Sequence, residues 1–163
     1  MKTTQALCAA LLLGCATMPL FTQEPEDVSA TPVVLGIYDS RVLAVAYFRS
    51  VEFEKQLDAL QGSATGEEMQ ALQERMHRQG FGTAPIPGIL SRIEEEYEAI
   101  AQETGVDVIV NRWALDYRGD KVQAVDISFR MAQGFSPSED TLKVMRDLTA
   151  QEPATDEQLR HPH

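Results

Sequence analysis

Few residues in this chain have the types and spacing that catalysis or metal binding requires. His77 lies in a polar stretch with helical character, and His161 and His163 flank a proline at the end of the chain. A hydrolytic triad built on His77 would need a serine at a sharp turn, and the chain has no Gly-x-Ser-x-Gly sequence for such a turn. Two histidines on a flexible tail do not make a metal site. The sequence therefore favours a protein that is not an enzyme and that uses no cofactor or metal.

Carboxylates are the next candidates, because paired acids can transfer protons or bind Ca²⁺. Asp107, Asp116, Asp120 and Asp126 lie on or beside segments that we predict to be strands. The alternation of a half-buried strand explains Asp107, and the chemistry of a turn explains Asp120. We interpret all four as structural residues rather than as a site.

The first 21 residues have the pattern of an export signal. Lys2 precedes an apolar core of about a dozen residues, which is too short to span a bilayer, and small residues follow it. Within this segment, Leu12–Cys15 resembles the bacterial lipobox, whose cysteine is lipidated and becomes the new N-terminus. The alternative is that Cys15, like Cys8, merely lies in the apolar core. These are the two cysteines of the chain, so we expect no disulfide in the exported domain.

Charge and composition narrow the classes of partner. The 163 residues carry a formal net charge of −11, which disfavours binding to nucleic acid and electrostatic docking on anionic lipid headgroups. Residues 22–31 are polar and contain Pro25, as a flexible linker does. Residues 151–163 predict a disordered tail. One domain of roughly 120 residues, 32–150, remains between them.

Hydrophobic periodicity predicts an α+β domain that begins with a strand at 33–38. Asp39 or Ser40 can cap the helix that follows, because their side chains accept from the free N–H groups of its first turn. This helix starts inside the core and extends outward for roughly 33 Å, to residue 61. A second helix, at 67–79, follows it, so the two form a protruding helical hairpin, or arm.

A loop rich in glycine and proline, residues 80–88, follows the arm. Gly80 suits a left-handed stop for the helix before it, and Thr83 suits the cap of the helix after it. Phe81 and Ile86 are the apolar side chains of this loop. They either staple two helices together or form an exposed contact surface for a partner.

Two further strands are predicted after that helix. The segment 106–113 is the stronger of them, and a turn at 117–120 separates it from the strand at 121–127. We predict that these two strands form a small antiparallel pair. Trp113 and Tyr117 flank the turn and are either core residues, which we favour, or an exposed aromatic contact surface.

Helix signals complete the domain. Gly105 ends the helix before the strands, and Ser128 can cap a short helix at 129–133. The sequence Ser136-Pro-Ser-Glu139 has the form of a capping box with proline at the first helical position. It opens a last helix that extends to residue 150.

Three stretches of the chain share their layout with a known family. They are LGIYDSRVL at 35–43, YEAIAQETGVDVIVNRWALDY at 97–117 and VQAVDISFRM at 122–131. In order, they resemble the opening strand and helix, the returning helix with its strands, and the closing strand of the OmpH family, the Skp-like periplasmic chaperones. In this chain the arm is shorter and glycine-rich segments interrupt it. The chain is also acidic, whereas the well-known chaperones are basic.

The resemblance implies an OmpH-like body and, with it, a trimer. In that family, short strands from three subunits assemble into a small barrel, and helical arms project from it to enclose unfolded outer-membrane proteins. We therefore expect an oligomeric chaperone, or holdase, in the periplasm or cell envelope, which binds unfolded or envelope proteins. Lipidation of Cys15 would anchor it to the outer membrane.

Two other functions stay open at this stage. The first is a lipid-anchored structural or adaptor protein of the envelope that has the same body but no chaperone activity. The second is a small hydrolase or metal enzyme, which would need a pocket that holds His77 with two carboxylates.

Overall fold

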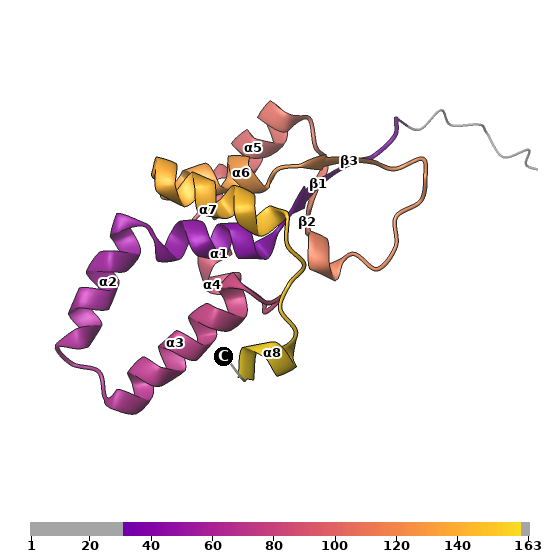
Figure 1. Ribbon diagram of the computed structural model, residues 1–163. Coiled ribbons are helices and arrows are strands. Elements are labelled where there is room, and N and C mark those ends of the chain that lie inside the picture. The colour runs from indigo at the N-terminus through magenta and orange to yellow at the C-terminus, as the bar shows by residue number, and fades with distance from the viewer. Residues whose placement is uncertain (1–30, 161–163) are drawn as a thin grey trace, which may run out of the picture. The chain divides into compact units, whose positions relative to one another are not determined.

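Three short parallel strands form the sheet of this fold (Figure 1). The computed structural model describes residues 31–160. The strands are β1 (Val34–Tyr38), β2 (Val108–Asn111) and β3 (Gln123–Asp126). β1 lies between the other two, in the order β2-β1-β3. With the helices described below, this sheet confirms the α+β class.

The prediction of an antiparallel pair between the second and third strands is wrong. Each pairs with β1 instead, and both pairings are parallel: Gly36 lies opposite Ile109 of β2 and opposite Val125 of β3. The segment between β2 and β3 includes the 3₁₀ helix η2 (Arg112–Ala114) and does not form a tight hairpin. It carries the chain across to the other edge of β1. β1 is apolar and can pair with one strand at each of its two edges. Parallel pairing also brings the C-terminal ends of the three strands to one edge.

The first helical segment is two helices rather than one. They are α1 (Ser40–Phe48) and α2 (Val51–Gln61). Asp39 caps α1 as predicted, since its side chain accepts from the backbone N–H of Arg41. Ser50 interrupts the helix because its hydroxyl accepts from the N–H of Phe53 and so caps a new helix. α1 is the buried part: Val42 and Leu43 are fully inaccessible to solvent.

The arm folds back on the body. Helix α3 (Gly66–Gly80) begins with a capping box formed by Thr65 and Glu68, and it returns to the side of α1 in Figure 1. Its residues Leu72 and Met76 pack against the hydrophobic core. The hairpin predicted to protrude is therefore partly anchored on its own domain.

The next segment contains the helices α4 (Pro87–Leu90), η1 (Glu94–Glu96) and α5 (Tyr97–Thr104). Gly80 is the last residue of α3 and has no positive φ, so the predicted left-handed stop is wrong there. Thr83 does not cap α4, which starts at Pro87 with Ile86 in the capping position. The left-handed end at Gly105 is confirmed, with φ of 68°.

The C-terminal helices are α6 (Ser128–Ala132), η3 (Gln133–Phe135), α7 (Glu139–Thr149) and α8 (Asp156–Arg160). Ser128 is the first residue of α6 rather than its cap, and Ser138, not Ser136, caps α7. Helix α8 lies where we expected a disordered tail. Its first turn is held by contacts between Thr155 and Gln158, which accept from each other's backbone N–H. Residues 161–163 lie outside the described part.

The two faces of the sheet have different surroundings. A Cβ atom at Gly36 would lie 2.7 Å from Cδ1 of Ile127 and 3.0 Å from Cγ2 of Val106, so this face carries the core. A glycine is needed here because other side chains approach the strand closely. The opposite face, which we call the open face, presents the half-buried or exposed aliphatic residues Leu35, Ile37, Val108, Val110 and Ala124, and the exposed Asp126 lies opposite Ile37 at its C-terminal end.

Candidate functional site

A buried ion pair lies at the C-terminal edge of the sheet. Asp39 follows β1, and Arg41 holds its carboxylate with two nitrogens: Nη2 to Oδ2 at 2.7 Å and Nε to Oδ1 at 3.1 Å. Trp113 Nε1 also donates to Oδ1, at 3.0 Å, and the Trp113 ring lies 4.9 Å from the guanidinium carbon. The remaining terminal nitrogen, Nη1, donates to the carbonyl of Gln151 at 2.9 Å. Asp39 and Arg41 are 0% and 1% exposed.

This cluster is built for structure rather than for proton transfer. Burial alone would raise the pKa of Asp39, but hydrogen bonds from Arg41 and Trp113 and the charge of Arg41 outweigh burial and hold the pKa below its usual value. An ionised carboxylate with both oxygens bonded is a poor general base near neutral pH. The backbone N–H of Asp39 is also bonded, to Ser128 Oγ at 2.8 Å. The cluster thus ties the end of β1 to α1, to α6 and to the loop after β2.

The four aspartates singled out in the sequence are not brought together. Asp107 accepts from the backbone N–H of Val34 at 2.9 Å. Asp126 accepts from Arg112 at 2.5 Å. Asp116 and Asp120 are exposed on the connection between β2 and β3. Each carboxylate therefore serves its own local structure or faces solvent.

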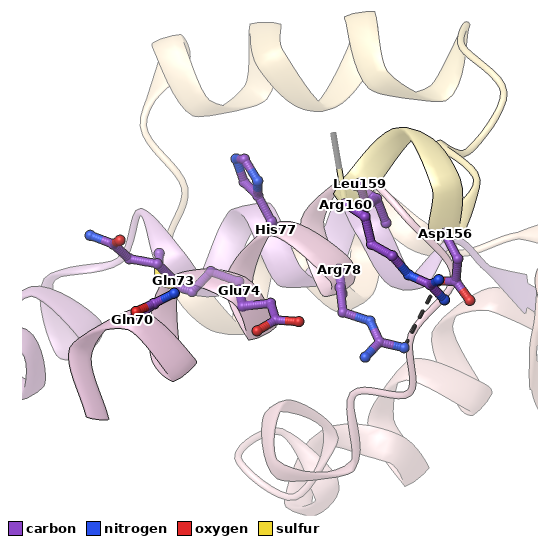
Figure 2. Close-up of a pocket in the computed structure, with 9 residues that line it drawn as sticks. Gln70, Gln73, Glu74, His77, Arg78, Asp156, Leu159 and Arg160 are labelled. Carbon is purple, nitrogen blue, oxygen red and sulfur yellow. Dashed lines mark ion pairs between the residues drawn. The ribbon is translucent and has the colours of Figure 1, made fainter. Parts of the chain in front are cut away.

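A pocket of about 570 Å³ lies between α3 and α8 and brings His77 near two carboxylates, Glu74 and Asp156 (Figure 2). These are the residue types that a hydrolase or metal enzyme would use. However, the His77 ring and the Glu74 carboxylate point in different directions from α3. Asp156 faces Arg78 at 3.9 Å, and the His77 ring packs edge-on against Phe81, with 5.4 Å between centroids. The side chains do not converge on a common point where a reacting atom or ion would sit.

Residues 31–160, the described part of the chain, hold neither a cluster of metal ligands nor a helix suited to span a membrane. Within that range, no group of three or more His, Cys, Asp or Glu side chains is arranged to hold a metal ion. None of the helices in the same range is both long and apolar enough to cross a membrane.

The open face is the strongest candidate for binding another protein. Five of its members are aliphatic, with Val108 44% exposed, and at its C-terminal end Asp126 pairs with Arg112. A shallow hollow of about 220 Å³ lies at its C-terminal end, where the apolar residues Ile37, Leu115, Ala124 and Val125 meet the charged residues Arg112, Arg118 and Asp126. Exposed aliphatic side chains rimmed by charged residues usually mark a protein contact.

The arm offers a second, smaller apolar surface. Tyr47, Phe48 and Phe53 form an aromatic cluster with ring centroids 5.0–5.6 Å apart, which fixes the start of α2 on the end of α1. Beyond it, Leu57 and Leu60 on α2 are half-buried. The part of α2 beyond the cluster therefore combines apolar side chains with solvent access.

The residues predicted for partner contact have different environments. Ile86 is 2% exposed and belongs to the core, so it is not available to a partner, whereas Phe81 is 49% exposed beside His77. Trp113 is half-buried in the polar cluster described above. Tyr117 is 82% exposed, so the core interpretation is wrong for it. Cys15, the predicted lipidation site, lies outside the described residues.

Sequence reasoning missed the Asp39–Arg41 pair, although it recognised Asp39 as a cap. The available signal was an arginine two residues after the cap, at the start of a helix whose following residues, 42–48, are all apolar. It also missed the contact between Arg41 and Gln151, because nothing local links residues 110 positions apart. Comparison of the chain with protein families, with curated proteins and with solved structures found no match.

Proposed function

We propose that this chain is an exported, non-enzymatic binding protein with an OmpH-like body that self-associates through the open face of its sheet. The observation that carries this proposal is the aliphatic surface formed by Leu35, Ile37, Val108, Val110 and Ala124, on the side of the sheet away from the core. A strand that is apolar on both faces needs cover on both. This chain's helices cover one face, and further copies of the chain would cover the other, as the barrel of the OmpH family does.

The solution mass of residues 31–163, measured by light scattering over a wide range of concentration, tests this proposal. A stable trimer is the expected result. Ile37→Asp places a charge on the open face and should yield a folded monomer. A wild-type protein that is monomeric at all concentrations would contradict self-association.

We propose further that the oligomer acts as a periplasmic holdase for unfolded envelope proteins. The half-buried leucines of α2, Leu57 and Leu60, supply an apolar surface on the arm that an unfolded chain can contact. The protein in molar excess should slow the aggregation of an unfolded outer-membrane barrel protein. Leu57→Ser with Leu60→Ser should weaken this protection, while Glu54→Ser, on the same helix, should not.

One observation favours the alternative, a structural or adaptor protein without chaperone activity. Helix α3 packs on the body through Leu72 and Met76, and the aromatic cluster fixes α2 on α1. An arm held in this way has less freedom to enclose a client than a long projecting one. Failure of the wild-type protein to slow aggregation, together with a stable oligomer, would identify this alternative.

The proposed location is the periplasm or cell envelope, with a lipid anchor on Cys15. The basis is the signal pattern of residues 1–21 and the Leu12–Cys15 sequence. Cys15→Ala should block processing and shift the protein from the membrane fraction to the soluble fraction. Unchanged processing and fractionation would contradict lipidation of Cys15, and the protein would then be exported without a lipid anchor.

A further inference from the structure

The segment after α7, residues 151–160, runs across the molecule to the end of α3, and we call it the C-terminal strap. At its start, the carbonyl of Gln151 accepts from the buried Arg41. In its middle, the backbone N–H of Ala154 donates to the carbonyl of Phe81 at 2.8 Å. These two contacts place an extended stretch of chain against the α3–α4 loop and the ion pair.

Helix α8 then ends the strap against α3. A Cβ atom at Gly82 would lie 2.9 Å from Cδ1 of Leu159, so the leucine packs directly on this glycine. Asp156 faces Arg78 at 3.9 Å on the exposed side of α3 (Figure 2). The surface formed by Arg41, Phe81, Gly82 and the end of α3 is thus covered by an extended segment, then by a helical turn with an acidic residue and a leucine.

The strap is attached loosely compared with the buried helix α1. A cavity of about 390 Å³ lies between it and the residues Arg41, Phe81 and Leu148, and the 570 Å³ pocket lies beside α8. Pro153, Ala154 and Leu159 are half-buried, and the other strap residues are exposed. A helix of five residues has no stability of its own in water. Segments with few buried contacts open at low free-energy cost while the core stays folded.

We propose that the strap is a releasable occupant of a peptide-binding groove. In the closed form it fills the groove formed by Arg41, Phe81, Gly82 and the end of α3. In the open form the groove offers a guanidinium donor, a carbonyl acceptor and an apolar contact at Gly82. It then binds a segment of another protein with the chemistry of the strap: extended backbone followed by a helical turn that carries an acidic residue and a leucine. This surface is separate from the open face, so it does not depend on the oligomer proposed above.

Hydrogen exchange of the full chain tests whether the strap opens by itself. The amide of Ala154 should exchange much faster than that of Met131, which donates to Ile127 in the core, and more slowly than a free peptide. Leu159→Ala should speed exchange at Ala154 by about tenfold and leave Met131 unchanged. Exchange of Ala154 together with the core, or at the rate of a free peptide, would overturn the proposal.

Peptide binding tests whether the groove takes a segment from outside. A labelled peptide with the sequence of residues 151–160 should bind the Leu159→Ala protein about tenfold more tightly than the wild type, because apparent affinity follows the open fraction. Leu90→Ala, which changes a half-buried leucine on α4, is the matched control and should bind like the wild type. Binding should also change the fluorescence of Trp113, the single tryptophan, which stacks on Arg41. Equal binding to all three proteins, or no binding, would show that the groove is not a peptide site.

Discussion

The two faces of the three-stranded sheet are both mainly apolar, yet they meet different surroundings. On the covered face, side chains approach so closely that β1 has a glycine at its centre, with Ile127 and Val106 against it. On the open face, the same strands present aliphatic side chains that are only partly shielded, with Val108 almost half exposed. The apolar character of these strands therefore corresponds to two different environments. One face packs in the core of the domain, and the other is the surface that we propose for a partner.

The largest effect is expected at the end of the covered side, where Asp39 and Arg41 are buried together. Asp39→Asn keeps the shape of the side chain but leaves the Arg41 charge without its counter-ion. Breaking one partner of a buried pair costs about 3–5 kcal/mol of unfolding free energy. Urea denaturation should show this loss. The control Asp120→Asn changes an exposed carboxylate and should stay within about 0.5 kcal/mol of wild type. A small effect at Asp39 would mean that the pair contributes little to the fold.

The same ion pair predicts how the unfolding free energy depends on pH. The pKa of Asp39 is lower in the folded protein than in the unfolded chain, so its contribution is fully present above about pH 4 and is lost as the pH falls through the folded value. The stability gap between wild type and Asp39→Asn should therefore narrow below about pH 4. Urea denaturation of both proteins from pH 7 to pH 2 measures this difference in unfolding free energy. A gap that stays constant over this range would exclude Asp39 as the titrating group.

Packing at the centre of the covered face predicts a smaller loss. Gly36→Val introduces methyl groups where Ile127 and Val106 leave no room, and both of those residues are buried. Overpacking of this kind costs about 1–3 kcal/mol. Thermal unfolding at fixed protein concentration should show a lower midpoint. An unchanged midpoint would mean that this face is less tightly packed than the contacts of Gly36 indicate.

Local signals in the sequence predicted the elements better than their pairing. The strand at 33–38, the cap at Asp39 and the stop at Gly105 were correct, because each depends on a few neighbouring residues. The predicted direction of β3 was wrong. A turn-like sequence at 117–120 suggests a hairpin, but β2 and β3 each pair with an edge of β1 instead. This outcome depends on contacts between distant residues, which periodicity does not reveal.

Burial of individual candidates was equally hard to predict. Phe81 and Ile86 stand five residues apart on one loop, yet one is half exposed and the other is in the core. Their types are similarly apolar, so the sequence gives no reason to separate them. The contact of the strap with Arg41 and Phe81 also joins segments that are distant along the chain, and the polar composition of residues 151–160 hides it.

The smallest expected effect on the fold gives the sharpest comparison of the two faces. Val106 and Val108 stand two residues apart; the first packs against Gly36 on the covered face, and the second lies opposite Leu35 on the open face. Val106→Thr buries a hydroxyl group and should cost about 1–3 kcal/mol. Val108→Thr makes the same chemical change at a half-exposed position and should alter the stability of the single subunit by less than about 0.5 kcal/mol.

The two variants should also differ in their association, measured as solution mass by light scattering. If copies of the chain meet at the open face, Val108→Thr weakens the oligomer although the subunit stays stable. Val106→Thr should show the opposite pattern. Its subunit should be less stable, but the folded protein should associate like the wild type. A Val108→Thr protein that unfolds as readily as Val106→Thr would mean that this chain itself covers both faces. The open face would then be part of the core rather than a surface for a partner.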